Sequence, residues 1–458
     1  MSAWHGLSRR SFVTGVGSAR ALGVPWELLR AEVVPTLSLL PFLARPTRNS
    51  ILVNARNGHM DAEVLLEFRP LRSRDSPGAS GASDWIASGS KRSVEAGEFV
   101  DWDVGGLEAG AAYEYRVQMA LAGGDPLPVA TGRFTTQRTG EDSFTAALMT
   151  DAHTGAFHDG QAPIEVLDEV TRNVRQDRPE FVLALGDNVA WPTSRNLPQT
   201  DDVGARRAYD MYRRHTAPLT TSCPHFGLIG NWEGETGKVP EASSDLVAVV
   251  RHQYTPGPND QTYAQGGSPN EDYYAFDWGP VLFVVLNVQS YTEPSGEAAS
   301  VRDDVTIVED WTLGGVQFEW MERVLKESDH PFKFICIHHA VGGNAANETE
   351  TLYGRGGGRA ANVGEQGLVH EMMQDLGVQI FFHGHDHVFV DQVVDGIHYT
   401  MPGSCGAPWR FGREITGYRR HWADAGHGRL IVRPDQATVE FVSQAGQVIH
   451  EFAVTPGR

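Results

Sequence analysis

The chain has 458 residues, which is long for a single compact core and predicts two or three domains. Its formal net charge of −20 excludes nucleic acid as an expected partner, because such a charge balance gives no means of releasing phosphate counterions. Cys223, Cys336 and Cys405 lie in separate segments, so their spacing fits neither a disulfide framework nor a thiolate zinc site.

The first 45 residues are expected to form a leader and a linker. The segment Ser8-Arg9-Arg10 with Phe12 resembles a twin-arginine export signal, although Arg20 interrupts the apolar stretch that follows and no clear Ala-x-Ala cleavage site comes after it. We therefore expect a periplasmic or extracellular bacterial protein, with a basic N-terminus on a cytoplasmic protein as the alternative. No segment is long and apolar enough to predict a transmembrane helix.

Residues 46–138 are expected to form a small all-β sandwich. Segments 50–58 and 62–71 alternate apolar and polar residues, and turns rich in Gly, Ser, Asp and Pro separate the candidate strands. The stretch GLEAGAAYEYRVQM resembles a strand pair of a fibronectin type III module, in which Leu107, Tyr113 and Tyr115 would brace one sheet on the other. Such a module is expected to position or shield the neighbouring domain.

Cys336, further along the chain, is expected to pack as a small apolar side chain.

A polar linker ends near residue 142, and residues 143–458 are expected to form one α/β domain. An apolar run at 144–149, a helical spacing through Ile164, Leu167, Val170 and Val174, and a second apolar run at 181–185 predict strand, helix, strand. Further strands are expected at 279–287, 332–340 and 378–387, and helices at 314–328 and 365–377. The tail at 429–454 alternates like antiparallel strands with Gly446 in a turn.

Polar clusters follow five of these apolar runs. Alone, each is weak, because one Gly-Asp is often a turn and one buried histidine is usually satisfied by a backbone partner. Together they bring carboxylate, amide and imidazole groups to strand ends, and these are ligands for Mn, Fe or Zn. The clusters are Asp151-Ala152-His153, Gly186-Asp187-Asn188, Gly230-Asn231-Trp232-Glu233, His338-His339 and His383-Gly384-His385-Asp386-His387.

In type and order these clusters resemble the five motifs of the calcineurin-like metallophosphoesterase superfamily, from about Ser143 to the C-terminus. The resemblance implies a four-layer αββα sandwich after the β-sandwich, and two divalent or trivalent metal ions, Mn, Fe or Zn, of one kind or mixed. By the same resemblance one metal is held by Asp151, His153 and His387, Asp187 bridges, and the second is held by Asn231, His338 and His385. Asp386 is a candidate for orienting an imidazole.

The implied reaction is hydrolysis of a small phosphate ester, in which a metal-bridging hydroxide attacks phosphorus in line. Two departures refine the match. His153 and Ala190 stand where the purple acid phosphatases have glycine and tyrosine, so no tyrosinate-bound iron is expected. Trp232 stands where the family usually has a histidine that contacts the phosphate or helps the leaving oxygen depart, and an indole has no proton to transfer usefully.

Asp187, Asn231, Trp232 and His339 are therefore the expected catalytic groups, with His339 or His225 as compensation for the missing histidine. Arg355 and Arg359 are candidate phosphate clamps, against the simpler reading of a solvated loop. We expect a phosphomonoesterase or phosphodiesterase. The alternatives are a phosphodiesterase restricted to nucleotides or phospholipid headgroups, and a non-catalytic metal-containing binding protein.

Overall fold

The structure is a computed structural model. It describes residues 39–58, 60–71, 84–121, 124–155, 164–190, 193–194, 197–198, 201–233, 241–288, 299–302, 305–307, 313–339, 365–407, 418 and 420–457. Residues 1–38 of the expected leader and linker, and the two candidate clamps Arg355 and Arg359, lie outside the described residues. The expected boundary at residue 46 is too late, because residues 40–44 already form a strand that pairs with residues 52–56. Among the helices that are described, none combines the length and the apolar character that crossing a bilayer requires.

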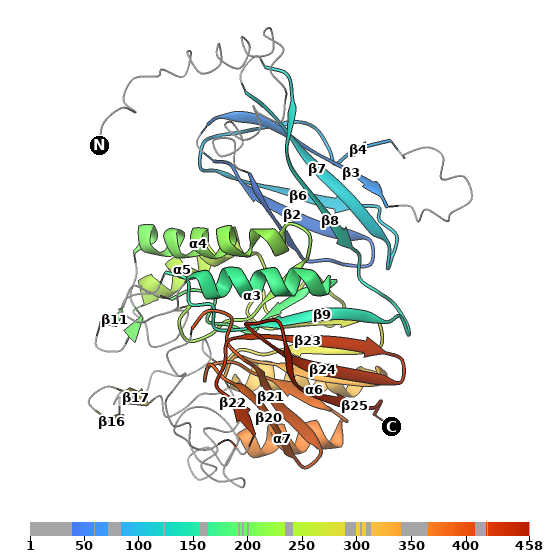
Figure 1. Ribbon diagram of the computed structural model, residues 1–458, viewed down its shortest axis with the longest axis vertical. Helices are drawn as coiled ribbons and strands as arrows, with labels where there is room; N and C mark the ends of the chain where they lie inside the picture. Colours follow the sequence, from blue (N-terminus) through green and yellow to red (C-terminus); the bar gives the residue numbers. More distant parts are fainter. Residues whose placement is uncertain are drawn as a thin grey trace.

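Strands between residues 40 and 135 form an N-terminal β region of two antiparallel sheets (Figure 1). One sheet has the order β1-β2-β6, with β1 (Leu40–Ala44), β2 (Ser50–Arg56) and β6 (Phe99–Gly105). The other has the order β4-β3-β7-β8, with β5 also paired to β3: β3 (Ala62–Pro70), β4 (Ile86–Ala87), β5 (Arg92–Val94), β7 (Ala112–Leu121) and β8 (Leu127–Thr135). Leu107, Tyr113 and Tyr115 are buried between them, as predicted. The assignment to fibronectin type III stays a prediction.

Two larger sheets make up the rest of the molecule. The first has the order β13-β10-β9-β23-β24-β25, with β9 (Phe144–Met149), β10 (Val182–Ala184), β13 (His225–Gly227), β23 (Gly426–Arg433), β24 (Gln436–Ser443) and β25 (Val448–Val454). The second has the order β14-β15-β18-β19-β21-β20-β22, with β14 (Tyr274–Trp278), β15 (Val281–Val285), β18 (Phe332–Cys336), β19 (Ile380–Phe382), β20 (Phe389–Val394), β21 (Ile397–Pro402) and β22 (His421–Trp422). Two short hairpins pair β11 (Thr193–Ser194) with β12 (Leu197–Pro198) and β16 (Ala299–Arg302) with β17 (Val305–Ile307).

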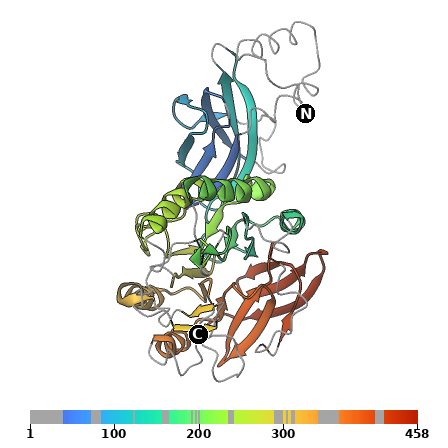
Figure 2. The same cartoon turned by 90° about the vertical axis from the view of Figure 1, so that its left-hand side faces the viewer.

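Helices cover the outer face of each sheet, so the layers are αββα and the predicted fold class is confirmed (Figures 1 and 2). The helices α3 (Ile164–Asp177), α4 (Asp202–Thr220) and α5 (Glu241–Tyr254) pack on the first sheet. The helices α6 (Gly314–Glu327) and α7 (Glu365–Asp375) pack on the second. In α3 the predicted apolar spacing buries Leu167, Val170 and Val174.

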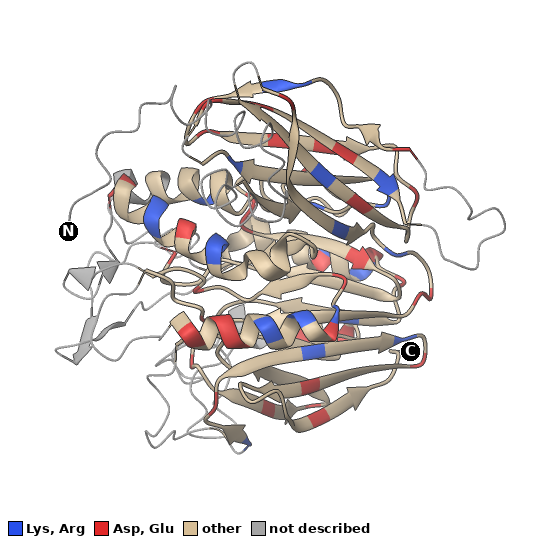
Figure 3. Ribbon diagram, turned by 45° about the horizontal axis from the view of Figure 1, so that its top comes forward, with Lys and Arg blue, Asp and Glu red and all other residues tan. Residues whose placement is uncertain are grey.

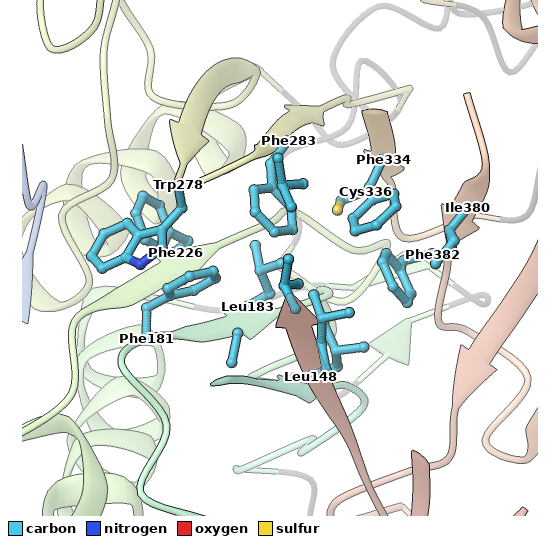
Figure 4. Packing of buried hydrophobic residues seen from close by; sticks show 14 of the residues in the cluster. Leu148, Phe181, Leu183, Phe226, Trp278, Phe283, Phe334, Cys336, Ile380 and Phe382 are labelled. Atoms are coloured by element: carbon cyan, nitrogen blue, oxygen red, sulfur yellow. The ribbon is translucent and has the colours of Figure 1, made fainter. Parts of the chain in front are cut away.

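Aromatic side chains fill the space between the two sheets (Figure 4). Phe226 of the first sheet stacks on Phe276 of the second with ring centroids 3.9 Å apart, and Phe181 meets Phe283 edge to face. Burial of such rings removes large apolar areas from water and is the main stabilising contribution to this core. Cys336 is fully buried in the same cluster, as predicted for a small apolar side chain.

The N-terminal β region is bound tightly to the α4 side of the sandwich, which Figure 2 shows with α4 running across its base. Arg213 of α4 is buried and donates hydrogen bonds to Asn54 Oδ1 and to the Leu40 carbonyl, both at 2.5 Å. Its guanidinium also lies over Phe42, 5.2 Å from the ring centroid. Arg56 makes a bidentate pair with Asp210 of α4 at 2.8 and 2.9 Å. The junction is therefore a built interface of buried polar and aromatic contacts.

Strand direction decides where functional groups gather. The strands β9, β10 and β13 are mutually parallel, and so are β15, β18, β19 and β21. Parallel strands end at the same edge of a sheet, and this edge is where α/β proteins place ligands. The polar clusters named above all follow these strands.

Candidate metal centre

Five loops after parallel strands deliver the predicted ligands. Asp151 follows β9, Asp187 follows β10 and Asn231 follows β13 in the first sheet. His338 follows β18 and the segment 383–387 follows β19 in the second sheet. The site is therefore assembled from both halves of the sandwich, as the strand-end pattern in the sequence predicts.

Two groups of side chains bring possible ligand atoms within 4.8 Å of one another. The first contains Asp151, His153, Asp187 and His387, all buried. These are the three ligands expected for one metal together with the expected bridging carboxylate. Nε2 of His387 lies 3.2 Å from Asp151 Oδ1, and Nε2 of His153 lies 3.4 Å from Asp187 Oδ2.

The second group contains His338, His339 and His385. His338 and His385 are expected ligands, whereas His339 was expected to act on the substrate. The His339 ring lies close to His385, with centroids 4.1 Å apart, and both are buried. Nε2 of His338 lies 3.1 Å from Asp187 Oδ2, so Asp187 stands between the two groups, as a bridging carboxylate would.

The chemistry of these atoms fits a cation. Among the residues that the structure describes, buried Asp151 Oδ1, Asp187 Oδ2, Asn231 Oδ1 and His338 Nε2 make no regular hydrogen bond. The other ring nitrogen of His338, Nδ1, is 2.7 Å from the Leu185 carbonyl, which fixes Nδ1 as the donor and turns the Nε2 lone pair to the site. Buried carboxylate and amide oxygens that make no regular hydrogen bond need a positive charge beside them, from a metal ion or from protonated imidazoles.

The pKa values of the buried histidines and carboxylates also indicate that the site needs positive charge. Burial alone would lower the pKa of His338, but the Asp187 carboxylate raises it to about 9. Burial alone would raise the pKa of Asp151, but the charge of His387 holds it well below its usual range. Without metal, protonated histidines thus neutralise the carboxylates, and a metal ion binding there would displace those protons.

Backbone strain is concentrated at the same residues. Nine described non-glycine residues have positive φ, and five of these are expected ligands: Asp151, His153, Asp187, His385 and His387. The left-handed conformation is unfavourable for residues with a Cβ, so the surrounding contacts must hold it in place. These five strained residues all belong to the two groups of possible ligands.

Glu233 belongs to one of the polar clusters found in the sequence, but the sequence assigned it no role in the site. It is buried, and its Oε2 accepts hydrogen bonds from the backbone N–H of Asp187 (3.1 Å) and Gly230 (2.7 Å), while Oε1 accepts from the N–H of Asn188 at 2.8 Å. One carboxylate therefore holds the β10 and β13 loops together. Burial and the Asp187 charge raise its pKa to about 7. The Gly-Asn-Trp-Glu spacing was the available signal.

Asn231 and Trp232 form the partly exposed side of the site. The backbone N–H of Trp232 donates to Asp187 Oδ1 at 2.8 Å, and its ring meets His153 edge to face with centroids 5.7 Å apart. Gly230 permits this approach, since a Cβ there would lie 2.2 Å from Asp187 Oδ1. The indole is thus an aromatic wall beside the metal ligands.

Two other sequence candidates are placed differently. His225 is buried at the start of β13, where its Nε2 lies 2.8 Å from the Tyr212 hydroxyl and its ring packs on Phe42. It belongs to the core below α4, which gives no support to a substrate role. Asp386 accepts a hydrogen bond from the Tyr418 hydroxyl at 2.6 Å, so Tyr418 holds the turn between His385 and His387.

A family model described as calcineurin-like phosphoesterase matches residues 144–389. No curated protein matches the chain. Among solved structures, PhoD is similar with a TM-score of 0.66 and 13% identity, over 92% of this chain and 90% of that one. Purple acid phosphatase PPD1 from seeds of yellow lupin (Lupinus luteus) is similar with a TM-score of 0.64 and 16% identity, over 91% and 74%. At these identities the likeness concerns the fold alone.

Proposed function

Because this chain belongs to the calcineurin-like phosphoesterase family and is a metal-dependent phosphoesterase, we propose that it works with two metal ions held between its sheets. Asp151, His153 and His387 would hold one ion, and Asn231, His338 and His385 the other, with Asp187 shared. The observation that supports this most is the position of Asp187 Oδ2, 3.4 Å from His153 Nε2 and 3.1 Å from His338 Nε2.

Metal ions bound there would supply a water of lowered pKa and would draw charge from the phosphate oxygens. The protein's own contribution is to hold the ligands before substrate arrives. Glu233 fixes the loops of Asp187 and Gly230, and the Leu185 carbonyl fixes the tautomer of His338. Such preorganisation avoids reorganisation cost during the reaction.

Trp232 sets the demand on the leaving group in this proposal. It lies beside His153 and is partly exposed, but its indole N–H cannot give a proton to a departing alkoxide. Loss of a general acid typically costs about 10²–10⁴-fold when the leaving group needs a proton. We therefore expect phosphate esters with stable leaving anions to be hydrolysed faster than alkyl phosphate esters. This should hold for both monoesters and diesters. His339, which is buried against His338 and His385, is the candidate for compensation.

The test is hydrolysis of p-nitrophenyl phosphate and bis-p-nitrophenyl phosphate by protein stripped of metal and reloaded with Mn²⁺, Zn²⁺ or Fe²⁺. Turnover restored by metal and lost in Asp187→Ala, with bound metal per chain measured alongside, supports the proposal. Asp435→Ala, in the exposed turn between β23 and β24, is the matched control. Two ions bound without turnover on either ester would contradict the proposed reaction, and a single ion in an active protein would contradict the dinuclear site.

A further inference from the structure

A polar cavity lies on the side of the molecule away from the candidate metal ligands. It has a volume of about 720 Å³ and is bounded by the N-terminal β region on one side and the C-terminal ends of α3 and α4 on the other. Three arginines line it, Arg133 from β8 and Arg175 and Arg178 from the end of α3. We propose that this cleft binds a small polyanion with clustered phosphate groups.

Unbalanced charge is the first observation behind the proposal. Other arginines at the junction are neutralised across it, since Arg56 pairs with Asp210 at 2.8 Å and Arg138 with Glu180 at 2.7 Å. Arg133, Arg175 and Arg178 make no ion pair with any residue that the structure describes. Three unneutralised guanidiniums on one cavity are unexpected in a chain of net charge −20, and they focus a positive potential there.

The acidic residue in the described lining does not cancel this charge. Glu114 accepts a hydrogen bond from Arg69 Nε at 2.6 Å, so its carboxylate is already paired. Trp85 also lines the cavity, and the guanidinium carbons of Arg69 and Arg116 lie 4.4 and 4.3 Å from its ring centroid. Arg69 and Arg116 are themselves paired, with Glu114 and Glu67, so the wall around Trp85 adds an aromatic face and the positive charge comes from the other three arginines. Figure 3 shows that the basic residues of α3 lie in its C-terminal half, whereas its first turns carry acidic residues.

Arg178 occupies a position where an arginine is unfavourable. It directly follows the last residue of α3 and has φ +52°, the left-handed conformation in which helices usually place glycine. Its N–H still closes the helix on the Arg175 carbonyl at 3.3 Å. An exposed arginine is kept here at a cost in backbone energy that glycine would avoid, and it lines the cleft.

The position excludes a part in the metal centre. Pro179 and Cys223 line the cavity just before β10 and β13, whereas Asp187 and Asn231 follow the same two strands. These strands are parallel, so the cleft and the candidate metal ligands lie at opposite ends of the strands. A polyanion bound there would touch both the N-terminal β region and the catalytic sandwich. Guanidinium forks suit phosphate oxygens, which accept two hydrogen bonds from each.

The test is calorimetric titration of the full-length, metal-loaded protein with tripolyphosphate at low salt. We expect one site per chain beyond binding at the metal centre. Each of Arg133→Gln, Arg175→Gln and Arg178→Gln should weaken that site about tenfold, because each removes a charged hydrogen-bond donor. Arg172→Gln, an exposed arginine of α3 that does not line the cavity, is the matched control and should stay within about twofold of wild type by charge screening.

Arg178→Gly is a second variant that relaxes the backbone, so it should fold at least as well as wild type and still lose the site. The proposal is overturned if wild type shows no second site, if the triple arginine variant binds as wild type does, or if Arg172→Gln weakens binding as much as the three. ATP and tripolyphosphate distinguish the sources of phosphate. Tighter binding of ATP that disappears in Trp85→Ala indicates a nucleotide, and equal binding indicates a free oligophosphate.

Discussion

Replacement of Glu233 tests whether its carboxylate positions the metal ligands. In Glu233→Gln one carboxylate oxygen becomes an NH₂ group, which cannot accept a hydrogen bond. If the remaining oxygen still accepts from the Asn188 N–H, the NH₂ group faces the backbone N–H groups of Asp187 and Gly230. Each buried donor left without an acceptor costs about 1–3 kcal/mol, so two cost about 2–6 kcal/mol before relaxation. Relief from burying a carboxylate beside Asp187 offsets part of this, and we expect a net loss of about 2–4 kcal/mol.

The assay separates a positioning role from a merely stabilising one. Mn²⁺ affinity is measured by calorimetry, and unfolding by urea with and without EDTA. If Glu233 positions Asp187, Glu233→Gln weakens Mn²⁺ binding by about 10–100-fold, as loss of an outer-shell partner does. Glu319→Gln, at an exposed position of α6, should leave both quantities unchanged. A Glu233→Gln protein that is less stable but binds Mn²⁺ as tightly as wild type would refute the reasoning.

Three further changes have defined outcomes. Gly230→Ala places a Cβ 2.2 Å from Asp187 Oδ1 and should reduce Mn²⁺ affinity about 10–100-fold in calorimetry. Gly315→Ala is the control, because a Cβ there meets nothing within 4 Å. Equal Mn²⁺ affinities of the two variants would contradict the role of the Gly230 contact. Arg213→Ala leaves the buried acceptors at the junction without a donor and should cost about 3–5 kcal/mol in urea unfolding, while exposed Arg214→Ala should cost under about 0.5 kcal/mol. His225 has its pKa lowered to about 3 by burial, so its stability contribution is complete above about pH 6.5 and is lost as pH falls towards 3. His225→Gln should flatten the acid limb of stability against pH between those values, and an unchanged slope would show that His225 is not buried neutral.

Much of the site could be predicted from the sequence because its chemistry depends on short motifs at strand ends. Apolar runs fix where a strand ends, and the next one to five residues are then confined to one edge of the sheet. Asp151, Asp187 and His338 were found in this way, and the structure brings them together. The order of strands in the sheets had no such signal, since it depends on contacts between distant segments.

Other features were missed for identifiable reasons. The helix α4 buries small and polar residues such as Ala205, Ala208 and Arg213 and contains a proline at residue 218, so its apolar stripe is weak in the sequence. The role of Glu233 depends on backbone N–H groups, which no sequence pattern displays. The place of His225 depends on Phe42, which lies in a different part of the chain and covers it only after folding.

The buried Arg213 junction has a consequence for how this chain could be divided. Domains joined by small polar contacts usually move against each other and can be separated or recombined. Here a fragment starting at residue 143 would leave Arg213 without Asn54 and would uncover the ring of Tyr254, which Phe99 and Arg56 contact. Cutting the chain at the linker near residue 142 should therefore destabilise both parts, because each would lose the partner of a buried polar contact.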